Sequence, residues 1–134
     1  MTPALQTAAA SLIMQIEGVR LTAYKDTGGV VTIGVGHTGK DVIEGSHVTI
    51  AQAMDLLKQD LAPIFAALDK AGVTSPGKVL AYASFGFNCG VGALGKVLAG
   101  QDRIDNPRHT RDARGNVLPG LLSRRNLEVA LLAV

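Results

Sequence analysis

The chain of 134 residues contains no tryptophan, a single cysteine and only 4% aromatic residues. A single cysteine excludes an internal disulfide framework, and we expect Cys89 to be a small buried side chain because it lies in the apolar run YASFGFNCGVGAL. Charged residues make up 18% of the chain with both signs mixed, which excludes a disordered polyelectrolyte. Repeats and low-complexity tracts are also absent, so the length predicts a single domain over residues 1–134.

The N-terminal segment lacks the basic residues that precede the apolar part of a secretory signal. Gln6, Gln15 and Glu17 interrupt its apolar residues, and the segment is too short and polar to span a membrane. We therefore expect an ordinary first helix, no export signal and no stable insertion into a membrane.

The net charge is only +2, but positive charge is concentrated between residues 96 and 125. That segment has seven Lys or Arg residues and three acidic residues, whereas the rest of the chain is net negative. Such a segment is either a solvated face or a surface that approaches an anionic polymer, such as nucleic acid or bacterial wall. Because it has no interleaved aromatics and no nucleic-acid-binding motif, we expect no nucleic-acid partner.

Apolar periodicity and capping residues predict a mostly helical chain with one small sheet, an α+β fold. The helices are expected over residues 3–17, 50–68, 76–90 and 120–133, with Pro63 kinking the second and the third almost entirely buried. The strands RLTAY and GVVTIGVGH flank the turn KDTGG. Two details are testable: the apolar stripe of the second helix begins at Ile50, and the last helix offers four leucines for burial, Leu121, Leu122, Leu127 and Leu131.

Two carboxylates lie close to this Gly-rich hairpin. Glu17 is expected at a helix end, where the helix dipole makes an anion unfavourable, and this suits a proton donor. Asp26 is expected at the turn, where backbone N–H groups and solvent favour the ionised form. Thr32 follows on the second strand, where its hydroxyl could hold a water molecule. Acids in contrasting environments are typical of acid/base catalysis, although a surface glutamate and a turn-forming aspartate would show the same spacing.

The spacing of these three residues within the pattern EG-R-L-AYKDT-G--TIG-GHT resembles the phage-type lysozymes, the endolysins of glycoside hydrolase family 24. The resemblance resumes at AYASFGFNCGVGAL and at GNVLPGLLSRRNLEVALL, and it covers most of the chain from residue 12 onward. It implies a lysozyme-like fold with a substrate cleft between lobes. It also implies a monomeric muramidase that needs no metal or cofactor, cleaves peptidoglycan between N-acetylmuramic acid and N-acetylglucosamine, and reaches the wall from the host cytoplasm.

The resemblance assigns roles to the three residues at the hairpin. It implies that Glu17 is the general acid and that Asp26 and Thr32 hold the attacking water, so that the configuration at the sugar carbon is inverted. Thr38, Phe87 and Asn88 correspond to positions that contact substrate, although for the two helical residues packing is the alternative.

The resemblance also implies two structural ion pairs. His37 corresponds to a histidine that pairs with an aspartate on the next helix, for which Asp60 is the candidate. Arg124, or failing that Arg125, is expected to form an ion pair with Glu17.

Two departures from the family pattern affect the C-terminal lobe. His109 stands near the place of a usual tryptophan, and residues 93–108 are too few for the two extra helices that relatives have there. A lobe shortened in this way would also suit a lysozyme-fold wall-binding or structural component with little turnover, for example in a phage tail or injection device. The intact residues Glu17, Asp26 and Thr32 favour the enzyme.

Overall fold

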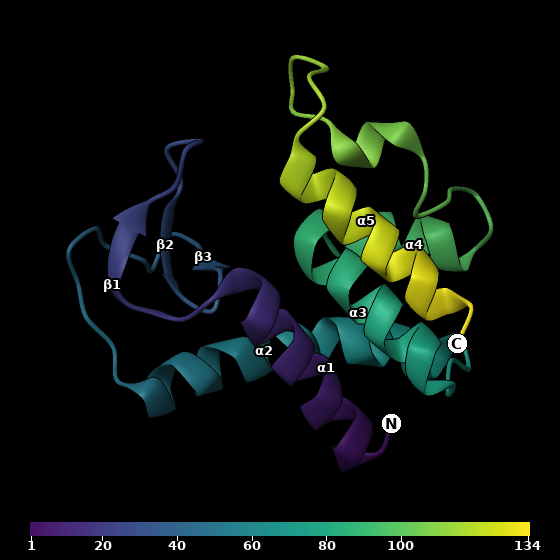
Figure 1. The fold of residues 1–134 in the computed structure, drawn as a ribbon. Helices are drawn as coiled ribbons and strands as arrows, with labels where there is room; N and C mark the ends of the chain where they lie inside the picture. The colour runs from purple at the N-terminus through teal and green to yellow at the C-terminus, as the bar shows by residue number, and fades with distance from the viewer. The chain divides into compact units, whose positions relative to one another are not determined.

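The computed structural model describes all 134 residues as five α-helices, one 3₁₀ turn and a three-stranded antiparallel sheet (Figure 1). The helices are α1 (Pro3–Glu17), α2 (Ile50–Lys70), α3 (Pro76–Cys89), α4 (Val91–Leu98) and α5 (Pro119–Leu132), and the 3₁₀ turn η1 is Pro107–Thr110. The strands are β1 (Arg20–Lys25), β2 (Val31–Gly34) and β3 (His37–Thr38). The predicted α+β class is confirmed. No helix combines the length and the apolar content that crossing a membrane requires.

The chain divides into two compact units. One consists of residues Ala10–Ala62, and the other combines Met1–Ala9 with Pro63–Val134. Helix α2 continues through Pro63, the residue at which the two units divide.

The predicted helix starts are confirmed at α1 and α2. The hydroxyl of Thr2 accepts a hydrogen bond from the Leu5 N–H at 3.2 Å. At α2, the Thr49 N–H donates to the Gln52 side chain at 2.9 Å, and the Gln52 N–H donates to the Thr49 hydroxyl at 3.1 Å. These reciprocal bonds form the capping box that the sequence predicts.

In the unit Ala10–Ala62, the sheet packs on the first half of α2. Strands β1 and β2 form the predicted hairpin, and β3 adds to the β2 edge. Gly34 lies against Ala53, whose Cβ would be 3.4 Å from a Cβ placed on the glycine. The core here comprises Ile13, Ala23, Ile33, Val35, Ala53, Leu57 and Leu61. Ile50 was predicted to join it but is 65% exposed, because it occupies the first turn of α2, ahead of the turns whose residues are buried.

In the other unit, α3 is the central helix, as predicted. Its buried residues include Val79 and Phe85, and Gly77 lies so close to the backbone of α5 that any side chain there would clash with the Leu131 carbonyl. The predicted burial of leucines on α5 is wrong, because Leu122 and Leu127 remain about 40% exposed and Leu121 and Leu131 are only half-buried.

The α5 residues that are buried are instead Arg124, Arg125 and Glu128. The reason is that these three charged side chains pair with one another and with polar atoms of α3, as described below.

The segment between α3 and α5 contains one α-helix and one 3₁₀ turn. Helix α4 ends at Leu98, and the only further helical element before α5 is the four-residue turn η1. The prediction that residues 93–108 are too few for two further helices is therefore confirmed.

Candidate active site

Asp26 occupies the turn between β1 and β2 and is held there by its own side chain. Its Oδ1 accepts hydrogen bonds from the backbone N–H groups of Gly28 at 2.8 Å and Val30 at 2.9 Å. The Asp26 N–H donates to the Val30 carbonyl, and the Gly29 N–H donates to the Asp26 carbonyl. The Oδ1 atom is thus engaged by the turn, while Oδ2 has no protein partner and is available to a ligand.

Asp26 and Thr32 share one face of the sheet. Thr32 pairs with Tyr24 on one side and with Thr38 on the other, and Asp26 lies opposite Val30. Residues opposite each other, and residues two apart along a strand, point to the same face. Asp26, Thr32 and Thr38 therefore lie on one face, with Thr32 diagonal to Asp26.

Thr32 is buried, and its hydroxyl donates to the Val30 carbonyl at 3.1 Å. A hydroxyl that donates in this way keeps its oxygen lone pairs as acceptors. Thr32 is thus suited to accept a hydrogen bond from one O–H of a bound water molecule, while the Asp26 carboxylate accepts a hydrogen bond from the other O–H.

Glu17 is the last residue of α1, as predicted, and is partly buried. It lies in the same unit as Asp26 and Thr32. Helix α1 therefore ends at a carboxylic acid, and only Gly18 and Val19 separate it from β1. Its expected ion pair with Arg124 stays a prediction.

The predicted pair of His37 and Asp60 is present. The Nδ1 of His37 lies 2.8 Å from an Asp60 oxygen, which joins β3 to α2. His37 has a second partner that was not predicted from the sequence, Asp41, whose carboxylate lies 3.2 Å from Nε2. Burial lowers the pKa of His37, but the hydrogen bonds and charges of Asp60 and Asp41 outweigh it, so the pKa is raised above 6.5.

Replacing His37 with glutamine is expected to lower the free energy of unfolding by about 1.5–3 kcal/mol near pH 6, the range for hydrogen bonds to charged groups. A histidine whose pKa is higher in the folded than in the unfolded chain stabilises fully below pH 6.5, and this contribution is lost as the pH rises through the folded value. The difference between parent and variant should therefore shrink between pH 6 and pH 9, as measured by urea denaturation. The control is His47→Gln, which removes an exposed histidine that bonds to Thr22 and no carboxylate; an equal pH dependence there would contradict the assignment.

A buried charged cluster links α5 to α3. The Oε2 of Glu128 accepts from the Ser84 hydroxyl at 2.5 Å and from Arg125 Nη2 at 2.9 Å, and its Oε1 lies 2.6 Å from Arg125 Nε in an ion contact not aligned as a hydrogen bond. Arg124 donates to the Ser84 hydroxyl and carbonyl at 3.2 and 3.1 Å. Burial raises the pKa of Glu128 even though these partners favour its charged form. The Arg-Arg-x-x-Glu spacing on one helix was the signal that could have revealed this cluster.

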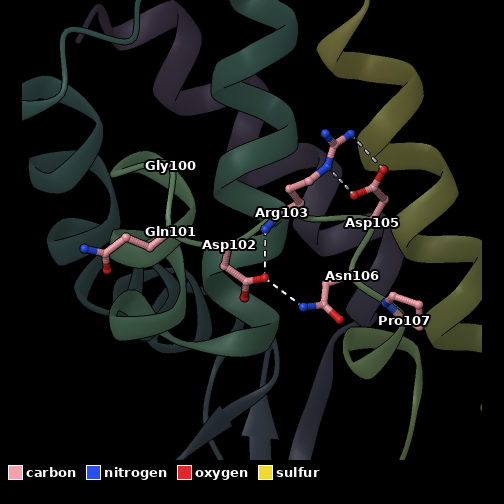
Figure 2. A pocket seen from close by; sticks show the side chains of 7 residues that line it. All are labelled: Gly100, Gln101, Asp102, Arg103, Asp105, Asn106 and Pro107. Atoms are coloured by element: carbon pink, nitrogen blue, oxygen red, sulfur yellow. Dashed lines mark hydrogen bonds and ion pairs between the residues drawn. The ribbon is translucent and has the colours of Figure 1, made fainter.

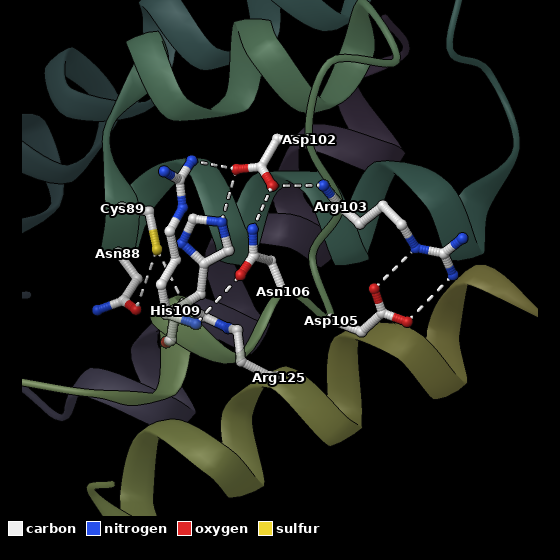
Figure 3. Close-up of polar contacts among 9 residues, drawn as sticks. Asn88, Cys89, Asp102, Arg103, Asp105, Asn106, His109 and Arg125 are labelled. Atoms are coloured by element: carbon white, nitrogen blue, oxygen red, sulfur yellow. Dashed lines mark hydrogen bonds and ion pairs between the residues drawn. The ribbon is translucent and has the colours of Figure 1, made fainter. Parts of the chain in front are cut away.

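Arg125 also contacts residues outside α5. Its Nη1 lies 2.9 Å from the Cys89 sulfur and 3.4 Å from the His109 carbonyl (Figure 3). Its guanidinium lies over the Phe85 ring. Cys89 is therefore half-buried beside a cation, rather than fully enclosed in the apolar core as expected. Burial raises the pKa of its thiol, against the effect of Arg125, so the sulfur is a packing group and not an activated nucleophile.

Asp102 organises the irregular segment between α4 and η1. Its Oδ1 accepts from the Arg103 N–H and the Asn106 amide, and its Oδ2 from Arg108 and His109, at distances of 2.6–2.9 Å (Figure 3). The four hydrogen bonds, that of Asn106 foremost, hold the pKa of Asp102 well below its usual range.

His109, near the position of the family tryptophan, thus contributes to structure by packing edge-on against Phe85.

A shallow hollow of about 520 Å³ lies over Gly100–Pro107, with the ion pair of Arg103 and Asp105 on its wall (Figure 2). Because both oxygens of Asp102 are already engaged, its carboxylate is structural.

The remaining candidate substrate residues differ in exposure. Thr38 and Asn88 are exposed, whereas Phe87 is half-buried on α3. Asn88 accepts a weak hydrogen bond from the Cys89 thiol at 3.6 Å. Contact of these three residues with substrate stays a prediction.

Known proteins are similar to this chain in both sequence and fold. The sequence matches the phage lysozyme family over residues 14–128. It is 35% identical to the SAR-endolysin of Escherichia phage Mu, over 89% of this chain and 75% of that protein. The endolysin of Escherichia coli O157:H7 phage FAHEc1 has a TM-score of 0.78 at 27% identity, covering 98% of this chain and 92% of that one. The muramidase domain of SpmX from Asticaccaulis excentricus has a TM-score of 0.73 at 31% identity, covering 95% of each chain.

The fold and the match to the family define a glycoside hydrolase of the lysozyme type. The chain belongs to the phage lysozyme family. It is a peptidoglycan hydrolase of the muramidase class, and the alternative of a binding or structural component without turnover is not favoured.

Proposed function

We propose that the protein cleaves the β-1,4 bond between N-acetylmuramic acid and N-acetylglucosamine by a single displacement. Glu17 acts as general acid, and Asp26 and Thr32 hold and activate the attacking water. The observation that carries this proposal is the hydrogen bonding of Asp26, which leaves Oδ2 without a protein partner on the face that it shares with Thr32.

The reaction requires one proton donor and one proton acceptor. Glu17 gives its proton to the glycosidic oxygen as the bond from the anomeric carbon to that oxygen breaks. Water attacks the same carbon from the opposite face, and its proton passes to the Asp26 carboxylate. The backbone N–H groups on Oδ1 hold the Asp26 side chain in place, so that Oδ2 can accept the proton.

Thr32 supports water attack over direct attack by Asp26. A retaining enzyme needs its two carboxyl groups about 5–5.5 Å apart, and an inverting enzyme about 6.5–9.5 Å, to leave room for water. A hydroxyl with free lone pairs on the same face as Asp26 is suited to holding that water, and a covalent nucleophile would not need it. Proton NMR of the first product from a soluble wall fragment should therefore show the inverted anomer; retention would make Asp26 the nucleophile.

Replacing Asp26 with asparagine is expected to lower kcat about 10²–10⁴-fold, because the amide keeps an oxygen for the turn but cannot accept the proton of water. A matched control exists at Asp112. Its Oδ1 accepts from the N–H groups two and four residues ahead, at 2.9 and 3.0 Å, in a second Asp-x-x-Gly-x turn. Asp112→Asn should show the same small loss of stability as Asp26→Asn but no loss of turnover. Turnover is measured by release of reducing ends, and stability by thermal unfolding. Equal turnover in the two variants would exclude Asp26 as the base.

We further propose the setting in which the enzyme acts. The whole chain, residues 1–134, works as a monomeric catalytic domain that needs no metal or cofactor, because Glu17 and Asp26 supply both proton transfers. Its site of action is the wall, reached in the periplasm after release from the host cytoplasm. The support for this is the similarity to proteins named SAR-endolysins.

A further inference from the structure

Tyr24 lies on the sheet face that carries Asp26 and Thr32, and the proposed mechanism gives it no role. It pairs directly with Thr32 across β1 and β2, so the two side chains point to the same face, with Cβ atoms about 4.5–5.5 Å apart. Asp26 follows Tyr24 by two residues and lies on that face as well. The Tyr24 side chain is therefore a neighbour of both residues that hold the attacking water in the proposed mechanism.

Tyr24 is the only Phe, Tyr or Trp residue in the unit Ala10–Ala62. Its side chain is half-buried and does not belong to the core of that unit. Its hydroxyl forms no hydrogen bond with another group of the protein. Tyr24 thus offers both an aromatic ring and a free hydroxyl to a ligand on the catalytic face.

The guanidinium group of Arg20 holds the ring of Tyr24 in place. The central carbon of this group lies 4.2 Å from the ring centroid, within the range of a cation–π contact. Arg20 is exposed, and no carboxylate of the protein pairs with it. Because Arg20 covers one face of the ring, the other face and the hydroxyl are the parts that a ligand can contact. A ring held in this way loses little freedom when a ligand binds, which lowers the entropic cost of binding.

We infer that Tyr24 is a substrate-binding residue, and that the sugar ring beside the scissile bond stacks on the face of Tyr24 opposite Arg20. A pyranose ring carries C–H bonds on its faces and polar groups at its edge. Tyrosine matches this arrangement because it has an apolar ring and a polar tip. The inference rests on the proposed function, since the sugar belongs to the glycan strand that the protein is proposed to cleave.

An anionic ligand on Arg20 fits the same face less well. The carboxylate of Asp26 lies on this face, and it would repel a second anion bound close to it. A neutral sugar ring meets no such repulsion. It also uses the aromatic surface of Tyr24, which an anion on Arg20 would leave without a partner.

The first test uses the near-ultraviolet absorbance of tyrosine, because the chain has two tyrosines and no tryptophan. The full chain carries Glu17→Gln, which prevents cleavage, and Tyr82→Phe, which leaves Tyr24 as its only tyrosine. It is titrated with soluble glycan strands from which an amidase has removed the peptide stems, and calorimetry measures binding in parallel. We expect a tyrosine difference spectrum that saturates together with binding. Binding without this spectrum, or no binding of the strands, would overturn the inference.

The second test compares affinities for the same strands in the Glu17→Gln chain. Tyr24→Leu should bind about 2- to 12-fold more weakly, the effect of losing a stacked aromatic contact, whereas Tyr24→Phe should keep most of the affinity. The matched control is Tyr82→Leu, which removes the other tyrosine and should bind like the parent. The loss in Tyr24→Leu should be the same at low and high salt, because stacking on a sugar involves no charge.

Three results of the second test would overturn the inference: an equal loss in Tyr24→Phe, an equal loss in Tyr82→Leu, or a loss that disappears at high salt. The last of these would indicate an anion on Arg20 instead of a sugar on the ring. Thermal unfolding checks that each variant is folded, and the first test keeps Tyr24 itself unchanged. Both tests measure binding without turnover. Release of reducing ends by the parent protein is measured separately, so a failure of the muramidase proposal is distinguishable from a failure of this one.

Discussion

Replacing Glu17 with glutamine is expected to reduce wall cleavage about 10²–10⁴-fold while the protein remains folded, because the amide cannot give the leaving sugar oxygen a proton. The side chain keeps its size, and Glu17 stands at a helix end, so the exchange disturbs little packing. The measurement is loss of turbidity of purified bacterial walls, together with release of reducing ends.

The control for this variant is Glu44→Gln in the same unit, where an exposed glutamate pairs only with Lys25 at 3.6 Å. It should cleave walls at the parental rate, since exposed ion pairs contribute little. A Glu17→Gln protein as active as the parent would remove Glu17 from the mechanism. If the parent protein binds walls but releases no reducing ends, the result would instead support the alternative of a wall-binding protein without turnover.

Replacing Glu128 with glutamine is expected to lower the free energy of unfolding by about 3–5 kcal/mol, the cost of leaving a buried charge without its partner. Glu128 has no exposed surface, and its carboxylate faces Arg125, Arg124 and Ser84. The variant would leave two buried guanidinium groups facing a neutral amide. Urea denaturation measures the change.

A double-mutant cycle separates this effect from simple packing. Arg125→Met combined with Glu128→Gln should cost less than the sum of the single changes, because removing both charges avoids the unpaired state. Glu44→Gln again serves as the exposed reference, with a change of less than about 0.5 kcal/mol. A Glu128→Gln loss as small as that of Glu44→Gln would show that the cluster does not stabilise the fold.

Features that depend on near neighbours in the chain were predictable from the sequence. The capping box of Thr49 and Gln52, the end of α1 at Glu17 and the turn at Asp26 each involve residues within a few positions of one another. The hairpin then sets the cross-strand register, which places Asp26 and Thr32 on one face. For this reason the resemblance and the local chemistry together were enough to name the candidate catalytic residues.

Which face of α5 is buried was decided only by the tertiary structure. Periodicity favoured Leu122 and Leu127, but α3 supplies Ser84 as a polar partner 44 residues away from Glu128, and Arg125 reaches Cys89 and the carbonyl of His109. A buried charge is tolerated only where such partners meet it, and a hydropathy pattern carries no information about partners so distant in the chain. The second carboxylate on His37 and the four bonds to Asp102 join residues at most seven positions apart, but these residues lie in or next to irregular segments, whose backbone no periodic pattern predicts. For partners distant in the chain, the sequence determined which groups could pair, and the packing of α3 against α5 and of the sheet against α2 determined which of them did.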